Sequence, residues 1–156
     1  MAKEIERKFL VEGGGWRALA DEGVAISQFY VAAAGDRTVR VRIIGNGEAR
    51  VTLKFGGAGR ERDEFEYPIP VEDARAMEPF ALGVVIEKRR HIVVHGGRRY
   101  EVDTFSGGLA GLVMAELETP DEVADDELPP WLGREVTDDT AYYNASLALA
   151  GLPGEH

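Results

Sequence analysis

Charged and apolar residues alternate along most of the chain. In the segment 37–44, which reads RTVRVRII, the apolar Val39, Val41 and Ile43 alternate with Arg40 and Arg42. Alternation with a period of two predicts a β-strand whose two faces differ in character. The pattern recurs and predicts a mainly β fold with eight strands, at 4–10, 25–33, 37–44, 48–55, 62–69, 84–95, 98–105 and 111–118.

Glycine-containing turns separate several of these strands. Asn46-Gly47 predicts a type I′ hairpin turn, and Gly96-Gly97 predicts another before the strand at 98–105. Hairpin turns make neighbouring strands antiparallel. No glycine cluster fits GxGxxG or GxxxxGK[ST] between a strand and a helix, so we interpret these clusters as turns rather than phosphate-binding loops.

A few helices flank the predicted strands. A short one is expected at 15–23, and another at 70–80, where Pro70 suits a helix start and acids follow in the first turn. The segment 137–154 predicts a C-terminal helix, with Thr137 or Asp138 as its cap and Gly151 as its end. We expect 118–133 to be an acidic connection, and residues 1–156 to form one domain.

The charges on the polar faces of the strands are segregated by sign. Side chains two positions apart, such as Arg40 and Arg42, lie about 6.6 Å apart on one face, so like charges there repel. The alternative interpretation is an ordinary sheet surface that faces solvent, but like charges at neighbouring positions would not stabilise such a surface. In chain order the spaced groups are Glu4/Glu6/Lys8, Arg40/Arg42, Thr52/Lys54, Arg62/Glu64/Glu66, Lys88/Arg90, Glu101/Asp103 and Glu116/Glu118.

A bound ligand would make the segregated charges useful. Paired arginines match the oxygens of a phosphate group, and paired carboxylates match a hard cation such as Mg²⁺ or Mn²⁺. Together they suit a metal-bound polyphosphate. Eight antiparallel strands can close into a barrel. We therefore predict an eight-stranded antiparallel closed tunnel barrel with a charged interior and an apolar outer face.

The composition excludes several other classes of protein. Without cysteine among its 156 residues, the chain has no disulfide and no thiolate metal site. A formal net charge of −10 argues against nucleic acid as a general partner. No apolar run suits a membrane span or a signal peptide. We expect a cytoplasmic protein, monomeric or homodimeric, without a membrane partner.

The order of these groups resembles the CYTH superfamily, the triphosphate tunnel metalloenzymes. The stretch EIERK at 4–8 has the ExExK arrangement of that family, and the later pairs follow in the family's order. The stretch GREVTDDTAYYNASLA at 133–148 is similar to the C-terminal EVTxDxxYxNxxLA of short bacterial members. The resemblance implies an eight-stranded tunnel and Mg²⁺- or Mn²⁺-dependent work on triphosphate groups.

The resemblance also implies a role for each charged position. The implied metal ligands are Glu4, Glu6, Asp103, Glu116 and Glu118, and the implied phosphate ligands are Lys8, Arg40, Arg42, Lys54, Arg62, Lys88 and Arg90. Glu64, Glu66 and Glu101 are implied supporting acids, which orient the basic side chains or reach a second metal. Lys8 and Tyr30 match a family pair implied to position the attacking water.

Short bacterial members imply hydrolysis of inorganic tripolyphosphate to phosphate and pyrophosphate. Two alternatives stay open: a nucleoside triphosphatase, thiamine triphosphatase or adenylate cyclase of the same fold, and a polyphosphate-binding module without turnover. The chain departs from the family at Thr140, where short members often carry lysine. The lost basic group puts the preferred substrate length and the turnover in question, but not the fold.

Overall fold

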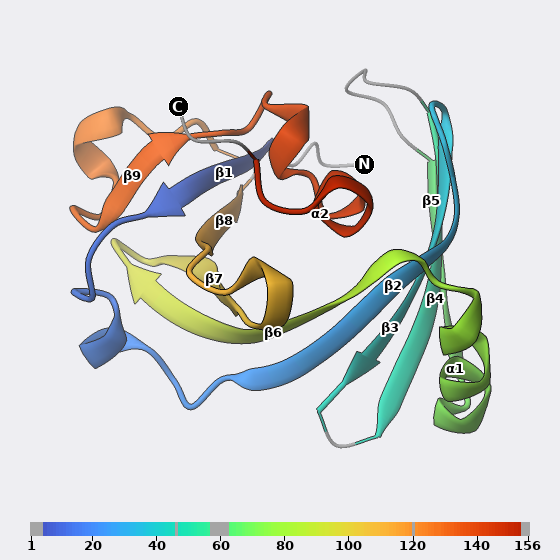
Figure 1. Ribbon diagram of the computed structural model, residues 1–156. Helices are drawn as coiled ribbons and strands as arrows, with labels where there is room; N and C mark the ends of the chain where they lie inside the picture. Colours follow the sequence, from blue (N-terminus) through green and yellow to red (C-terminus); the bar gives the residue numbers. More distant parts are fainter. Residues whose placement is uncertain (1–4, 46, 57–62, 120, 154–156) are drawn as a thin grey trace.

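The computed structural model describes residues 5–45, 47–56, 63–119 and 121–153. Its main element is an antiparallel sheet with the strand order β5-β4-β3-β2-β6-β7-β8-β1-β9 (Figure 1). The strands are β1 (Ile5–Val11), β2 (Val24–Ala34), β3 (Arg37–Ile44), β4 (Glu48–Phe55), β5 (Asp63–Ile69), β6 (Leu82–His95), β7 (Arg98–Phe105), β8 (Val113–Thr119) and β9 (Leu132–Glu135). The α-helices are α1 (Val71–Met77) and α2 (Asn144–Ala150).

The eight predicted strands are confirmed as β1 to β8. His95 pairs with Arg98 across the turn between β6 and β7. Gly96 and Gly97 in that turn have φ angles of 58° and 75°, as a type I′ turn requires. The β3–β4 hairpin also forms, although Asn46 in its turn lies outside the described residues.

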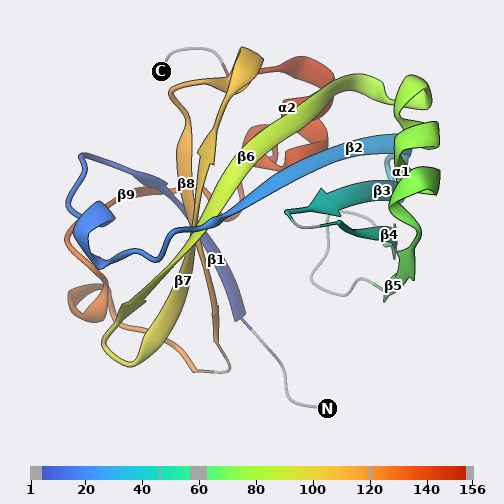
Figure 2. The same cartoon turned by 90° about the horizontal axis from the view of Figure 1, so that it is seen from below.

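The predicted closed barrel of eight strands is wrong in strand number and in closure. The sheet of nine strands curls into an open trough (Figures 1 and 2), and among the described residues no pairing joins its edge strands β5 and β9. β5 contains Pro68, which has no N–H to donate and therefore suits an edge strand. At the other edge, β9 pairs with the side of β1 that closure would need.

Strand β9 was not predicted, because its four residues, LGRE, show no alternation of apolar and charged positions. The strand is held by side chains instead. Arg7 of β1 donates to both carboxylate oxygens of Glu135, at 2.9 and 2.7 Å. Gly133 allows the close approach, because a Cβ there would lie 3.0 Å from the carbonyl oxygen of Leu10. The predicted acidic connection therefore ends in a strand.

Apolar side chains cover the outer face of the trough, as predicted. Under α1, Phe29, Val41, Ile43 and Ala49 pack against Ala74 of the helix. A second outer cluster consists of Trp16, Val93, Tyr100, Val102, Ala115, Leu117, Val123 and Trp131. Burial of this face stabilises the sheet and leaves the charged positions on the inner face.

Helix α2 packs against the inner side of the trough, over β6 and β2 (Figure 1). Its Leu147 and Ala148 belong to a buried cluster with Tyr30 and Ile86. Gly83 of β6 makes this packing possible: its φ is +64°, and a Cβ there would lie 2.0 Å from the carbonyl oxygen of Ala148. The helix therefore covers part of the charged face.

The helix predictions are confirmed at 70–80, which forms α1 and a 3₁₀ turn at Glu78–Phe80. The predicted helix at 15–23 is wrong beyond a 3₁₀ turn at Arg17–Leu19. The side chain of Asp21 accepts from the backbone N–H of Gly23 and of Ile92, which ties the segment to β6 instead.

The C-terminal helix ends at Gly151 as predicted, but it begins later than expected, at Asn144. Asp139 accepts from the N–H of Ala141 and caps a 3₁₀ turn before α2. The hydroxyl of Thr137, a predicted cap, accepts from the backbone N–H of Lys8. The segment before α2 therefore serves β1 rather than the helix.

No helix within residues 5–45, 47–56, 63–119 and 121–153 has the length and apolarity needed to cross a membrane.

Candidate active site

Strand pairing gathers the spaced charges on the inner face of the trough. Residues directly opposite one another on neighbouring strands share a face, and Glu6 lies opposite Glu118, as Arg90 lies opposite Asp103. The remaining pairings place Lys8, Tyr30, Arg40, Arg42, Lys54, Glu64, Glu66, Lys88, Glu101 and Glu116 on the same face. Glu4 and Arg62 lie outside the described residues, so their roles stay predictions.

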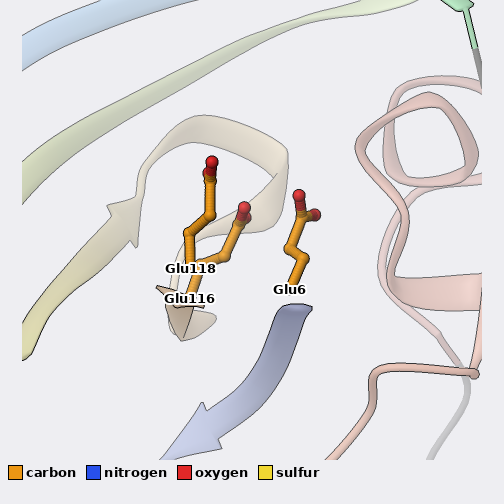
Figure 3. A group of neighbouring side chains, drawn as sticks. All are labelled: Glu6, Glu116 and Glu118. Atoms are coloured by element: carbon orange, nitrogen blue, oxygen red, sulfur yellow. The ribbon is translucent and has the colours of Figure 1, made fainter. Parts of the chain in front are cut away.

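Three carboxylates from β1 and β8 converge in the trough. One carboxylate oxygen from each of Glu6, Glu116 and Glu118 lies within 4.8 Å of the others, and the three side chains project in the same direction (Figure 3). The pKa of Glu6 is raised. The largest cause is the partial burial of its carboxylate within the trough, which disfavours the charged form, although part of the residue remains exposed to solvent. The negative charge of Glu116 adds to this effect.

The carboxylate cluster fits a hard divalent cation. It offers only oxygen donors, which Mg²⁺ and Mn²⁺ prefer to nitrogen or sulfur. A cation would also relieve the repulsion that raises the pKa of Glu6. Three of the five predicted metal ligands, Glu6, Glu116 and Glu118, are therefore brought together.

Asp103 lies apart from this cluster, between two cations of β6. Its carboxylate accepts from Nε and a terminal nitrogen of Arg90 at 2.8 and 2.9 Å, and from Nζ of Lys88 at 2.9 Å. Burial would raise the pKa of Asp103, but Lys88 and Arg90 hold it well below its usual value. Glu101 also accepts from Arg90, at 3.3 Å.

Lys88 is sealed inside the protein. Its side chain is 0% exposed, and its ammonium also donates to Asn144 Oδ1, at the first residue of α2, at 3.3 Å. Burial lowers the pKa of Lys88 to about 8 against the opposing effect of Asp103, and both groups stay ionised at neutral pH. This ammonium, predicted to bind phosphate, is thus enclosed by protein groups.

Arg40 and Arg42 of β3 form the basic part of the trough. A terminal nitrogen of Arg40 donates to Thr52 Oγ1 at 3.3 Å, and its nearest carboxylate contact, with Glu66, is 4.0 Å long. Arg42 donates from Nε to the side-chain oxygen of Gln28 at 2.8 Å. Burial, followed by repulsion from Arg40 and Arg90, lowers the pKa of Arg42 to about 10. Arg42 therefore remains cationic at neutral pH.

Lys54 and the acids of β5 extend this basic part toward the sheet edge. Burial and then the charge of Arg40 lower the pKa of Lys54, while Glu64, opposite on β5, partly offsets them. Glu66 accepts from Thr52 at 3.0 Å and from Arg50 at 2.9 Å. Glu64 and Glu66 therefore lie beside basic groups, and their supporting role stays a prediction.

Lys8 and Tyr30 lie in different surroundings. The Lys8 ammonium is 5.1 Å from the centre of the Tyr143 ring. It also lines a small pocket with Glu101, Asp103 and Glu116. Tyr30 is buried, and burial raises the pKa of its hydroxyl despite the nearby charges of Arg40 and Arg42.

Several residues that contact the site were not singled out from the sequence, among them Gln28, Tyr143 and Asn144. Gln28 occupies an inward position of β2, so strand alternation was a usable signal for it. Tyr143 and Asn144 reach Lys8 and Lys88 only because α2 folds back over the trough. No local pattern encodes that contact.

Comparison with known proteins identifies close relatives over nearly the whole chain. The CYTH domain family model matches residues 2–148. An inorganic triphosphatase from Acetivibrio thermocellus is 44% identical over 148 residues, covering 94% of each chain. One from Nitrosomonas europaea is 36% identical over 155 residues, covering 94% of this chain and 97% of that protein.

Solved structures agree with these relatives. The crystal structure of an inorganic triphosphatase is 35% identical, covers 99% of both chains and has a TM-score of 0.73. A putative adenylyl cyclase from Hippeastrum, at 14% identity and a TM-score of 0.59 over 76% of this chain and 80% of that one, shares the fold alone. On this evidence of sequence and structure, the chain belongs to the CYTH domain family.

Proposed function

We propose that this protein hydrolyses inorganic tripolyphosphate to phosphate and pyrophosphate, with Mg²⁺ or Mn²⁺ as its cofactor. The observation that carries the proposal is the inner face of the trough, where a carboxylate cluster and a set of partly buried cations lie on the same surface. The relatives named inorganic triphosphatase support the same activity.

Glu6, Glu116 and Glu118 would hold the cation, with Glu4 as a further ligand. Bound there, a divalent cation would offset negative charge on the phosphate oxygens. Asp103 is already engaged by Lys88 and Arg90. Its role in our proposal is therefore to fix these two cations, with metal ligation only after that network rearranges.

The basic side chains bind and align the phosphate chain. Arg40, Arg42 and Lys54 hold few carboxylate partners of their own, so their charge is available to phosphate oxygens. Arg90, fixed by Asp103, presents a guanidinium in a set orientation. Holding the phosphates in line with a water lowers the activation free energy, because the reacting groups are already positioned when the substrate binds.

The chemical step breaks one phosphoanhydride bond. A water oxygen attacks a terminal phosphorus, the bridging P–O bond breaks, and pyrophosphate leaves with the electron pair while the water gives up a proton. Lys8 and Tyr30 are proposed to position that water. Tyr30 is suited to donate a hydrogen bond because its raised pKa keeps the hydroxyl protonated.

The test is phosphate release from a panel of substrates with Mg²⁺ or Mn²⁺. We expect kcat/KM for tripolyphosphate to exceed that for ATP, thiamine triphosphate and long-chain polyphosphate by roughly tenfold or more. A preference for ATP or thiamine triphosphate would support the alternative enzymes of this fold. Tight binding of all substrates without phosphate release would support a binding module.

Two arginines of β3 make a matched pair of variants for this assay. Arg40 faces the trough, whereas Arg37 is exposed and pairs with Asp36 at the surface. Arg40→Ala should lower kcat/KM by roughly 10²–10³, the loss expected when one preorganised charge contact is removed. Arg37→Ala should behave like the wild type. Equal activities would show that the inner face does not bind the substrate.

A further inference from the structure

A buried glutamine stands among the basic side chains of the trough. Gln28 lies on β2 directly opposite Arg42, and it is 0% exposed. Its side-chain oxygen accepts from Arg42 Nε at 2.8 Å. A guanidinium can only donate hydrogen bonds. The oxygen of the carboxamide must therefore face Arg42, and this fixes the side on which the NH₂ group lies.

The NH₂ group of Gln28 has no hydrogen-bond partner among the described residues. Arg40 Nε, on the neighbouring strand, is buried and without a partner in the same way. A buried donor left unpaired costs about 1–3 kcal/mol, and native proteins rarely retain one without a reason. Gln28 lies opposite Arg42, and Arg40 is two residues from Arg42 on the same strand, so both donors lie on one stretch of the inner face, where an anionic ligand would supply an acceptor.

We propose that Gln28 is part of the triphosphate site: its oxygen orients Arg42, and its NH₂ group donates to an oxygen of the bound triphosphate. This inference rests on the proposed function and extends it to a residue with no charge. A phosphate oxygen accepts from several donors at once, so it satisfies Gln28 and Arg40 together.

The neutrality of Gln28 is part of its role. Arg42 is surrounded by like charges from Arg40 and Arg90. A glutamate at position 28 would pair with Arg42 and relieve this repulsion, but it would cancel the positive charge that binds the phosphate chain. A carboxamide supplies the acceptor for Arg42 without that loss, and adds a donor that a carboxylate lacks.

Two variants of Gln28 test the inference. Gln28→Met keeps length and burial but removes both polar atoms, and Gln28→Glu keeps the acceptor but adds a negative charge. We expect KM for tripolyphosphate to rise roughly tenfold in Gln28→Met and roughly 10²-fold in Gln28→Glu. The melting temperature without ligand should stay near wild type in Gln28→Met and should rise in Gln28→Glu.

The control is Ser27→Ala, on the outer face of the same strand opposite Ile43. It should leave KM and kcat unchanged. Calorimetric binding of tripolyphosphate in a chelator should show the same order of affinities, with wild type tightest and Gln28→Glu weakest. A purely structural role for Gln28 predicts instead that Gln28→Met loses stability but keeps its affinity for tripolyphosphate, because the NH₂ group would then make no contact with the ligand.

A KM near wild type in Gln28→Glu overturns the inference, as does a KM that rises only in proportion to lost stability. If Gln28→Met does not fold, Gln28→Glu decides alone. Arg42→Ala separates this inference from the proposed function. An impaired Arg42→Ala with normal Gln28 variants overturns only the role of Gln28, whereas a normal Arg42→Ala overturns the basic site itself.

Discussion

At the scale of single residues, the trough contains two kinds of charge. Asp103 compensates Lys88 and Arg90 within the protein, through bonds of 2.8–2.9 Å. Arg42 donates to a neutral acceptor, Gln28, and the nearest carboxylate to Arg40 among the described residues lies 4.0 Å away. The ion pairs of Asp103 with Lys88 and Arg90 therefore stabilise the protein without ligand, whereas the arginines of β3 are available to bind an anionic ligand.

The Asp103 group predicts a specific dependence of stability on pH. The pKa of Asp103 lies well below its ordinary value of 3.8 in the folded protein. The stability that it contributes is thus fully present above pH 3.8 and is lost as the pH falls toward the folded-state pKa. Asp103→Asn should cost about 3–5 kcal/mol at pH 7, because it removes the carboxylate that compensates the buried Lys88 and the partly buried Arg90.

Urea unfolding between pH 3 and pH 7 checks this prediction. The difference in unfolding free energy between wild type and Asp103→Asn should shrink as the pH falls below about 4. Asp36→Asn, which removes a fully exposed pair with Arg37, is the control and should change stability little. A constant difference across the whole pH range would show that Asp103 does not act through its charge.

The sequence predicted on which face of the sheet each described candidate residue lies, but not which residue lies opposite it on the neighbouring strand. Alternation places Arg90 and Asp103 on one face whatever the register. Their pairing depends on the turn at Gly96-Gly97, which sets Arg90 opposite Asp103. Asp103 was grouped with the metal ligands because of the family resemblance, which does not specify its neighbours, and the structure places it between two cations.

At the scale of elements, the long alternating strands and the C-terminal helix were predictable, whereas β9 and the docking of α2 over the trough were not. β9 and α2 are four and seven residues long, and each depends on contacts with distant parts of the chain. Arg7 holds β9, and the hydroxyl of Thr137 holds the backbone of Lys8. Tertiary contacts of this kind override weak local preferences.

The docking of α2 depends on Gly83. Gly83 and Gly97 both have positive φ, of 64° and 75°, but only at Gly83 would a Cβ meet another atom, the carbonyl oxygen of Ala148. Gly97→Ala should cost about 1–2 kcal/mol from backbone strain alone. Gly83→Ala should cost clearly more, and it should also lower activity, because α2 begins at Asn144 and follows directly on Tyr143, which contacts Lys8.

Thermal unfolding and tripolyphosphate hydrolysis of both variants measure these effects. The expected order of melting temperatures is wild type, Gly97→Ala, Gly83→Ala, with lost activity only in Gly83→Ala. Equal losses of stability in the two variants would mean that α2 adjusts without cost, and that its packing on β6 does not position the site.

At the scale of the whole molecule, the fold concentrates like charges on one inner face and covers the other face with apolar groups. Such a site stores electrostatic repulsion when it is empty, and binding stabilises the protein by mass action. This coupling between ligand binding and stability does not require a closed barrel, because the pairing of strands β1 to β8 already brings the charges onto one face of the sheet.

Two arginines distinguish stored repulsion from structural pairing. Arg42→Ala should melt, without ligand, at a temperature no lower than wild type, because it removes a cation whose pKa is lowered to about 10 by burial and like charges. Arg90→Ala should melt lower, because it removes a partner of Asp103. The increase in melting temperature on adding tripolyphosphate should be larger for the wild type than for either variant. A clear drop in Arg42→Ala would identify that residue as structural.

The most direct test of the account is a metal titration of tripolyphosphate hydrolysis in wild type, Glu6→Gln and the exposed control Glu87→Gln. We predict no hydrolysis in excess chelator, recovery with Mg²⁺ or Mn²⁺, and inhibition by the larger Ca²⁺. The metal midpoint should rise roughly tenfold or more in Glu6→Gln and stay unchanged in Glu87→Gln. Full activity in excess chelator, or an unchanged midpoint in Glu6→Gln, would contradict a metal site at the carboxylates of β1 and β8.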